Sequence, residues 1–299
     1  MSTFESTLRR AARTLRFALL GCAIGVGTCA QAQKAFPSAA DAADAFVDAV
    51  ARHDGQALKL VVGADYSKYL PHGNAEDVTQ FLEAFARSHK IVSAGDARAY
   101  LEVGSNGWTM PIPIVRTSAG WAFDPKQTPE ELRLRRVGRN ELEAIQVVLA
   151  YTDAQEDYAK YDRDRNGRAD YAQKLISSPG RHDGLYWPSK PGGPESPLGS
   201  EAVMTKPGEG FHGYQYRVLA AQGKNAPGGA KSYVVDGAMT GGYALVAWPA
   251  KWGETGVMSF IVSKDGIVYE KDLGPDSARI AAAMTAYDPD GSWVKVAQK

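Results

Sequence analysis

The sequence predicts an α+β fold: helices with an antiparallel sheet first, then a long helix packed on an antiparallel meander. Three observations predict this class. Stretches with helical periodicity and stretches that alternate and are rich in β-forming residues occupy separate parts of the chain. Turn-forming residues that include glycine separate the alternating stretches. The composition of the 299 residues, 44% hydrophobic and 23% charged, is that of a folded globular protein.

Residues 1–32 have the parts of a secretory signal peptide. Four arginines precede an uncharged, mostly apolar run over 17–29, and Ala30-Gln31-Ala32 supplies small residues where signal peptidase cleaves. We therefore expect cleavage before Gln33 and an exported protein, periplasmic or extracellular. The apolar run of 13 residues is shorter than the roughly 20 that a membrane-spanning helix needs. We expect no membrane span after cleavage.

Removal of the leader changes the chemistry available to the chain. Four arginines, one glutamate and both cysteines leave with it, so residues 33–299 carry a net charge of −3 and no thiol. A cysteine-free mature chain has no disulfides, thiolate metal sites or cysteine nucleophiles. Its near-neutral charge gives no electrostatic basis for nucleic-acid binding. The alternative to a signal peptide cleaved before Gln33 is the leader of a lipoprotein. Leu19-Leu20-Gly21-Cys22 resembles a lipobox, which would anchor the protein through Cys22.

The first domain, residues 33–127, is predicted to contain three helices followed by three strands. The helices are expected over 38–53, 56–62 and 76–89, and the strands over 97–103, 107–116 and 120–123. The segments AFVDAVARHD (45–54) and GWAFD (120–124) resemble the opening of a cone-shaped, nuclear-transport-factor-2-like domain. Because such domains often have a pocket, Trp108 and Trp121 are predicted ligand-binding residues, with core packing as the alternative.

The second domain, residues 128–299, is predicted to start with a long helix. Thr128 and Glu131 have the spacing of a capping box, and the helical pattern continues to about Tyr161, with a break expected near Gly138. The later elements are a surface loop over 177–210, strands over 214–219, 244–248, 256–262 and 267–273, and a terminal helix over 275–287.

This order of elements loosely resembles the type II secretion pseudopilins, which have a helix, an Asp-rich loop, a Gly-rich connector and a short meander. The resemblance implies an assembly module that often holds calcium. Pilins begin with an apolar membrane helix that polymerises. The equivalent helix here is internal and carries acidic residues along its length, among them Glu141, Glu143, Asp153, Glu156 and Asp157. We therefore do not expect a pilus subunit.

Several longer phrases are more distinctive. They are GRNELEAIQ (138–146), YTDAQEDY (151–158), DGLYW (183–187), PESPLG (194–199), GYQYR (213–217), MTGG (239–242) and VYEKDLG (268–274). Together they resemble an uncharacterised family of exported bacterial proteins, the family of unknown function numbered twenty-nine-fifty, over residues 34–296. The resemblance implies no catalytic residue, because no activity is established for that family.

An Asp-rich loop is the one candidate metal site. Residues 162–170 fit the pattern D-x-D-x-N-G-x-x-D, in which alternate oxygens converge because the chain turns at the glycine. Such oxygens suit a hard cation such as calcium. The candidate calcium residues are Asp162, Asp164, Asn166, Arg168 and Asp170. The alternative is an Asn-Gly turn in which the aspartates cap backbone amides.

Trp187 and His212 flank the long loop and are the remaining predicted ligand-binding residues, on a face that would bind a sugar or a peptide. The alternative is that aromatic residues attach the loop to the sheet. His182 with Asp183 and His212 flank the same loop and could meet, so a hydrolase acting on cell-wall material is a third interpretation. GEGFHG (208–213) has dinucleotide-binding spacing but enters a strand, which argues against a nucleotide site.

The sequence contains no H-E-x-x-H or G-x-S-x-G motif. We therefore expect a non-enzymatic binding or assembly module of the bacterial cell envelope, with a protein partner and with calcium as the one candidate cofactor. The alternative is a small-ligand carrier or enzyme that uses a pocket in the first domain.

Overall fold

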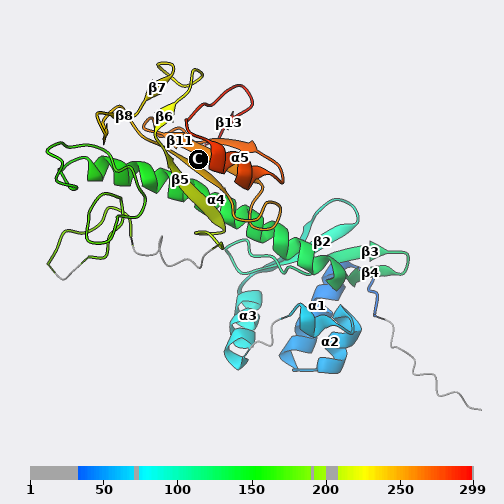
Figure 1. Ribbon diagram of the computed structural model, residues 1–299. Coiled ribbons are helices and arrows are strands. Elements are labelled where there is room, and N and C mark those ends of the chain that lie inside the picture. Colours follow the sequence, from blue (N-terminus) through cyan, green and yellow to red (C-terminus); the bar gives the residue numbers. More distant parts are fainter. Residues whose placement is uncertain (1–32, 71–73, 190–191, 200–207, 298–299) are drawn as a thin grey trace, which may run out of the picture.

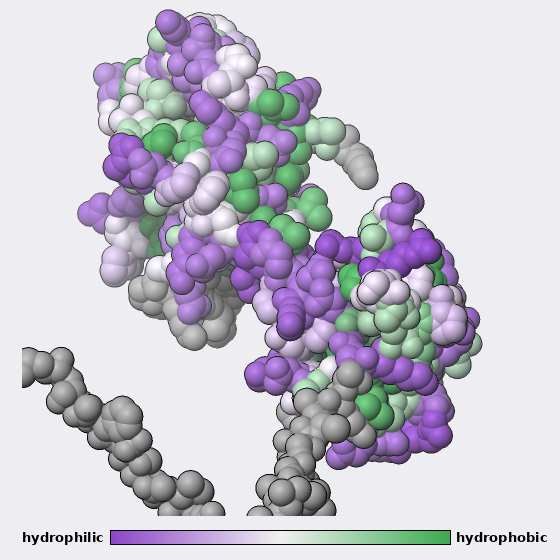
Figure 2. Space-filling model, turned by 90° about the vertical axis from the view of Figure 1, so that its right-hand side faces the viewer, coloured by the Kyte–Doolittle hydropathy of each residue, from purple (hydrophilic) through white to green (hydrophobic). Residues whose placement is uncertain are grey.

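The computed structural model describes residues 33–70, 74–189, 192–199 and 208–297. The predicted signal peptide and the lipobox lie outside the described residues. The described chain folds into two lobes joined by one long helix (Figure 1). Figure 2 shows the lobes as separate masses with hydrophilic residues at their junction. Helices and antiparallel sheets are both present, so the predicted α+β class is confirmed.

The first lobe packs three helices against a four-stranded antiparallel sheet in the order β1-β2-β3-β4. Its elements are α1 (Ala39–Ala51), α2 (Gly55–Val62), a 3-10 turn η1 (Tyr66–Lys68), α3 (Ala75–Arg87), β1 (His89–Ser93), β2 (Arg98–Val103), β3 (Ile114–Thr117), β4 (Gly120–Phe123) and a 3-10 turn η2 (Pro125–Gln127). Each helix begins at a polar cap. The side chain of Ser38 accepts a bond from the amide of Asp41, and Asn74 and Asp77 form a reciprocal capping box.

The core of this lobe lies between α1 and the sheet. In β2, Ala99, Leu101 and Val103 are buried and alternate with more exposed residues, as a sheet with one covered face requires. Phe46 of α1 packs its ring against Phe123 of β4, with ring centroids 5.6 Å apart. The outer edge of β4 is covered by the chain at Phe36, which forms an isolated bridge with Trp121.

The long helix α4 (Thr128–Tyr158) runs from one lobe to the other (Figure 1). Its 31 residues span about 46 Å. The first turns bond to the first lobe, where Glu131 accepts from the hydroxyl of Tyr100. Later turns bond to the second, where Glu141 accepts from two backbone amides next to the second sheet. The break predicted near Gly138 is wrong, because the helix is continuous through that residue.

The second lobe is built on a five-stranded antiparallel meander in the order β13-β12-β11-β10-β5. Its strands are β5 (Tyr214–Leu219), β10 (Ala244–Pro249), β11 (Met258–Ser263), β12 (Tyr269–Asp272) and β13 (Val294–Lys295). Two short hairpins also occur, β6 (Ala221–Gln222) with β7 (Lys231–Ser232) and β8 (Val234–Val235) with β9 (Ala238–Met239). The turn at 264–266 joins β11 to β12, as predicted.

The meander is covered on both faces. Four consecutive residues of β10, Ala244 to Ala247, are almost completely buried, although successive side chains point to opposite faces of a sheet. Two helices supply the cover, because α4 and α5 (Ser277–Ala283) both contact β10. On the α4 side, the hydroxyl of Tyr151 donates to the carbonyl of Ala244, 3.1 Å away.

The described residues form two hydrophobic clusters, one in each lobe. The domain boundary after residue 127 stays a prediction, since the first turns of α4 contact the first sheet. Among the described helices, none is both long and apolar enough to cross a bilayer.

Candidate functional site

The first lobe contains an apolar cavity of about 600 Å³. Helices α1, α2 and α3, the turn η1, the loop before β3 and one residue of α4 all contribute to its wall. The lining residues are Phe46, Val50, His53, Gly55, Leu58, Tyr66, Ser67, Tyr69, Leu70, Asp77, Val78, Phe81, Trp108, Met110, Pro111 and Leu132. The volume is within the range of roughly 300–1,000 Å³ that is usual for small-molecule sites.

The cavity has a buried floor and an open, apolar mouth. Phe46 and Met110 form the floor and are almost completely buried. Phe46 meets Phe81 edge-to-face, with ring centroids 6.0 Å apart, so α1 and α3 together set the shape of the wall. Two large apolar side chains are exposed at the mouth, Trp108 at 46% and Leu132 at 44%. Exposing two such side chains beside an apolar cavity is costly unless something covers them.

Few polar groups line this cavity. Apart from tyrosine hydroxyls, the polar side chains of its described lining are His53, Ser67 and Asp77, and all three lie at exposed positions. His53 follows α1 in a left-handed backbone conformation with φ of 51°. Asp77 also accepts a bond from the amide of Asn74 as part of the cap of α3. The interior is therefore apolar and aromatic, and its titratable groups are at the rim.

The two tryptophans predicted to bind a ligand in this lobe have different positions. Trp108 lines the cavity. Trp121 lies on β4, paired through its backbone with Phe36, and is not among the lining residues. Sequence reasoning missed the contributions of Val50, Asp77 and Leu132. Val78 and Phe81 of α3 have the three-residue spacing of one helix face, but such spacing does not show that a cavity lies beneath them.

The Asp-rich loop follows the end of α4, and its aspartates accept bonds from backbone amides around the Asn166-Gly167 turn, as the alternative interpretation describes. The backbone amide of Asn166 donates to Asp162 and to Asp164, at 2.9 and 3.2 Å. The side-chain amide of Asn166 donates to Asp164 and to Asp170, at 3.0 and 2.8 Å. Gly167, with φ of 85°, makes the sharp turn and donates to Asp162. For Arg168, the backbone amide donates to the side chain of Asn166.

Asp170 is the buried member of this loop, with 4% of its surface exposed. Burial raises the pKa of its carboxyl, the bond from Asn166 opposes that rise, and the nearby charges of Asp164 and Asp162 add to it. Within the described residues, no three His, Cys, Asp or Glu side chains are arranged as a ready metal site. A cation would therefore replace the amide bonds that these carboxylates now accept. The oxygen-rich donor set suits a hard cation such as calcium.

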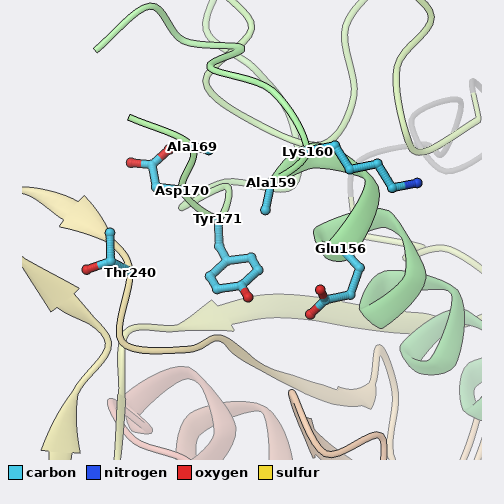
Figure 3. A pocket seen from close by; sticks show the side chains of 7 residues that line it. All are labelled: Glu156, Ala159, Lys160, Ala169, Asp170, Tyr171 and Thr240. Carbon is cyan, nitrogen blue, oxygen red and sulfur yellow. The ribbon is translucent and has the colours of Figure 1, made fainter. Parts of the chain in front are cut away.

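A polar hollow of about 410 Å³ lies between this loop and the end of α4. Figure 3 shows the ring of Tyr171 at its centre, with Glu156 on one side and Asp170 and Thr240 on the other, while Lys160 points away. The hydroxyl of Tyr171 accepts a bond from Lys264, which also forms an ion pair with Glu156. Tyr171, Lys264 and Glu156 therefore pair with one another at this hollow.

Trp187 and His212 each have a partner within the second lobe. Trp187 is 3% exposed, stacks on His182 at 4.3 Å, and donates its ring N–H to the carbonyl of Pro194. The Nδ1 of His212 lies 2.6 Å from a carboxylate oxygen of Glu143 on α4. The contacts of Trp187 lie within the long loop, and the contact of His212 joins the chain just after the loop to α4. The ligand-binding roles of Trp187 and His212 stay predictions.

Asp183, the acid of the hydrolase interpretation, is bonded within its own loop. It accepts from the backbone amide of Ser178 at 2.7 Å, from the hydroxyl of Ser178 at 3.0 Å and from Lys174 at 2.7 Å. Burial alone would raise the pKa of this carboxyl, but the bonds from Lys174 and Ser178 outweigh it and lower the pKa to about 2. Asp183 therefore has a structural role in closing the loop.

Comparison with known proteins gives a family without a function. The family described as "Protein of unknown function (DUF2950)" matches residues 33–296. The chain belongs to the DUF2950 family. The match begins at Gln33, the residue before which the sequence predicts cleavage. No curated protein and no solved structure matches this DUF2950 protein.

Proposed function

We propose that this DUF2950 protein is an exported, non-enzymatic binding protein that holds a small apolar molecule in the cavity of its first lobe. The observation that carries the proposal is the cavity itself, about 600 Å³ in volume, with a buried apolar floor and two exposed apolar side chains at its mouth. Filling it would remove Trp108 and Leu132 from water, which supplies a driving force of about 25 cal/mol for each Å² of apolar surface buried.

Binding is favoured over catalysis because of where the titratable groups lie. General acid–base chemistry uses side chains with tuned pKa values that are held beside the reacting atoms, usually out of water. His53 and Asp77, the charged or titratable lining groups other than tyrosines, are at exposed rim positions instead. A molecule seated between Phe46 and Trp108 would meet apolar and aromatic surfaces.

A second function is proposed for the Asp-rich loop, which we infer to bind calcium. The convergence of Asp162, Asp164 and Asp170 on Asn166 supports it, as does the raised pKa of Asp170. A divalent cation would neutralise the mutual repulsion of these carboxylates. With calcium bound, the second lobe would serve as a module for an envelope protein partner. Its long helix on an antiparallel meander supports that role.

The cavity is tested by filling it. Val78 lines the cavity from α3, and the next residue, Thr79, is exposed and is not among the lining residues. In a titration with the neutral apolar dye Nile red, wild type and the Thr79→Trp control are expected to bind equally. The Val78→Trp variant is expected to bind at least tenfold more weakly. Equal binding by both variants, or no binding by wild type, would contradict the proposal.

The calcium site is tested by thermal unfolding with and without 5 mM CaCl₂. The melting temperature of wild type is expected to rise, because a ligand that binds only the folded state stabilises it. The melting temperature of Asp170→Asn is expected to be insensitive to calcium. An unchanged wild-type melting temperature would refute calcium binding and leave the cavity proposal intact.

A further inference from the structure

In the first lobe, another hollow adjoins the apolar cavity. It also measures about 410 Å³ but is distinct from the hollow beside the Asp-rich loop. This second hollow and the apolar cavity share three lining residues, Asp77, Phe81 and Trp108, so they meet along one wall. The remaining lining residues of the second hollow are Gln80, Ala84, Arg87, Val103, Gly104, Ser105 and Asn106. We call this second hollow the polar groove. It runs between α3 and the loop that follows β2.

One side of α3 forms the helical wall of the polar groove. Asp77, Gln80, Ala84 and Arg87 follow one another at intervals of three or four residues, which places them on the same side of a helix. Arg87 follows Asp77 by ten positions, so their α-carbons lie about 15 Å apart along the helix axis. The groove therefore has an acidic end at the cavity and a basic end away from it.

The polar groove offers donors and acceptors in balance. Gln80 and Asn106 contribute amides, Ser105 a hydroxyl, Arg87 a guanidinium and Asp77 a carboxylate. No described residue forms an ion pair with Arg87. The side chain of Asn106 accepts a bond from the backbone amide of Trp108 at 3.1 Å, which fixes the loop beneath the exposed indole. The ring of Trp108 therefore stands where the apolar cavity and the polar groove meet.

We infer that the ligand of this protein is an amphiphile with an uncharged, hydroxyl-rich head, such as an alkyl glycoside. This inference rests on the proposed function, because the apolar part of the molecule would occupy the cavity. The head would lie in the polar groove against Trp108. Hydroxyl groups can donate to Asp77 and pair with the side-chain amides of Gln80 and Asn106 in the same groove.

The inference is tested by calorimetric titration with four compounds that share an eight-carbon chain, each kept below its micelle concentration. They are 1-octanol, octyl glucoside, octanoate and octyltrimethylammonium. Wild type is expected to bind octyl glucoside at least tenfold more tightly than each of the other three. The double variant Gln80→Leu/Arg87→Met changes two exposed groove residues of α3. It is expected to lose this tenfold preference while its affinity for 1-octanol is unchanged.

A matched control and the possible outcomes separate this inference from the proposed function. Glu83→Leu alters an exposed residue of α3 outside both hollows and is expected to bind all four compounds as wild type does. If none of the compounds binds, the proposed function and this inference both fail. If 1-octanol binds as tightly as octyl glucoside, the inference fails and the proposed function stands. Tightest binding of octanoate or of octyltrimethylammonium would also overturn the inference, in favour of a charged head.

Discussion

Replacing Asp183 by asparagine tests whether this acid stabilises the fold. The side chain is 17% exposed and accepts three bonds from Ser178 and Lys174. Its pKa falls from the usual 3.8 to about 2 in the folded protein. A tenfold change in an ionisation constant corresponds to about 1.4 kcal/mol, so the charged form stabilises the fold by about 2 kcal/mol once screening by water at its exposed edge is allowed for. Asp183→Asn is therefore expected to lower the free energy of unfolding by about 2 kcal/mol at pH 7.

The direction of the pH dependence follows from the lowered pKa of Asp183. The stabilisation is fully present above the pKa of the unfolded chain, near 4, and is lost as the pH falls toward the folded value of about 2. The difference in unfolding free energy between wild type and Asp183→Asn is therefore expected to be constant from pH 7 to about 5. It should then shrink toward zero at the lowest pH at which both proteins fold.

Urea unfolding at a series of pH values measures this difference directly. Asp153→Asn is the control, because it removes the same charge at an exposed position of α4. We expect the control to change the unfolding free energy by less than about 0.5 kcal/mol. A loss of less than about 0.5 kcal/mol for Asp183→Asn, or a loss that does not depend on pH, would show that the charge of Asp183 does not stabilise the fold.

The remaining predictions concern helix continuity, a tight turn, a buried hydroxyl and the Asp-rich loop. Gly138→Ala should raise the unfolding free energy by about 0.5–1 kcal/mol in urea unfolding, because the helix is unbroken there and nothing lies within 4 Å of the added methyl; destabilisation would indicate a kink. Gly184→Ala should lower the melting temperature markedly, since the methyl would lie 2.7 Å from backbone atoms of Ile176 and Ser177; an unchanged melting temperature would contradict this packing. Tyr151→Phe should cost about 1–2 kcal/mol, because its buried hydroxyl bonds to a carbonyl of β10 and to a buried glutamine amide; a cost below about 0.5 kcal/mol would contradict it. Without calcium, Asp170→Asn should stabilise the protein more at pH 7 than at pH 4, since a raised pKa means that the charged form is disfavoured on folding; a stabilisation equal at both pH values would count against this.

The sequence predicts most long elements because their periodicity is strong. The helices α1, α2 and α3 and the strands β2, β4, β5 and β10 all begin and end within two residues of their predicted limits. Strand β13 and the strands of the two small hairpins have two residues each, too few to show a period, and the sequence does not predict them. It does not predict β1 either, because the predicted helix over 76–89 runs into the start of that strand. The strand predicted over 107–116 is reduced to β3, since Pro111 and Pro113 lack the amide hydrogens that a ladder needs.

The start of α4 shows how tertiary contacts override a local pattern. Thr128 and Glu131 have capping-box spacing, yet no side chain caps this helix and, among the described residues, the hydroxyl of Thr128 has no partner. Glu131 instead accepts from Tyr100 and pairs with Arg135. The bond from Tyr100 ties the helix to the first sheet, and it is not visible in the spacing of residues along the chain.

Only part of the candidate site can be predicted from the sequence, because some of its lining residues come together only through tertiary contacts. The sequence predicts Trp108 as a ligand-binding residue because cone-shaped α+β domains often have a pocket. It does not predict Leu132, because that residue belongs to α4 and reaches the first lobe only through the fold. A cavity is a volume left unfilled by residues far apart in the chain, so its existence cannot be read from periodicity.

A crystal structure of the protein with octyl glucoside bound would show whether the cavity of the first lobe holds the alkyl chain. We expect density for that chain between Phe46, Phe81 and Leu132, with the head beside Trp108. A structure in which the protein's own side chains fill that space, and the compound is absent or bound elsewhere, would contradict it.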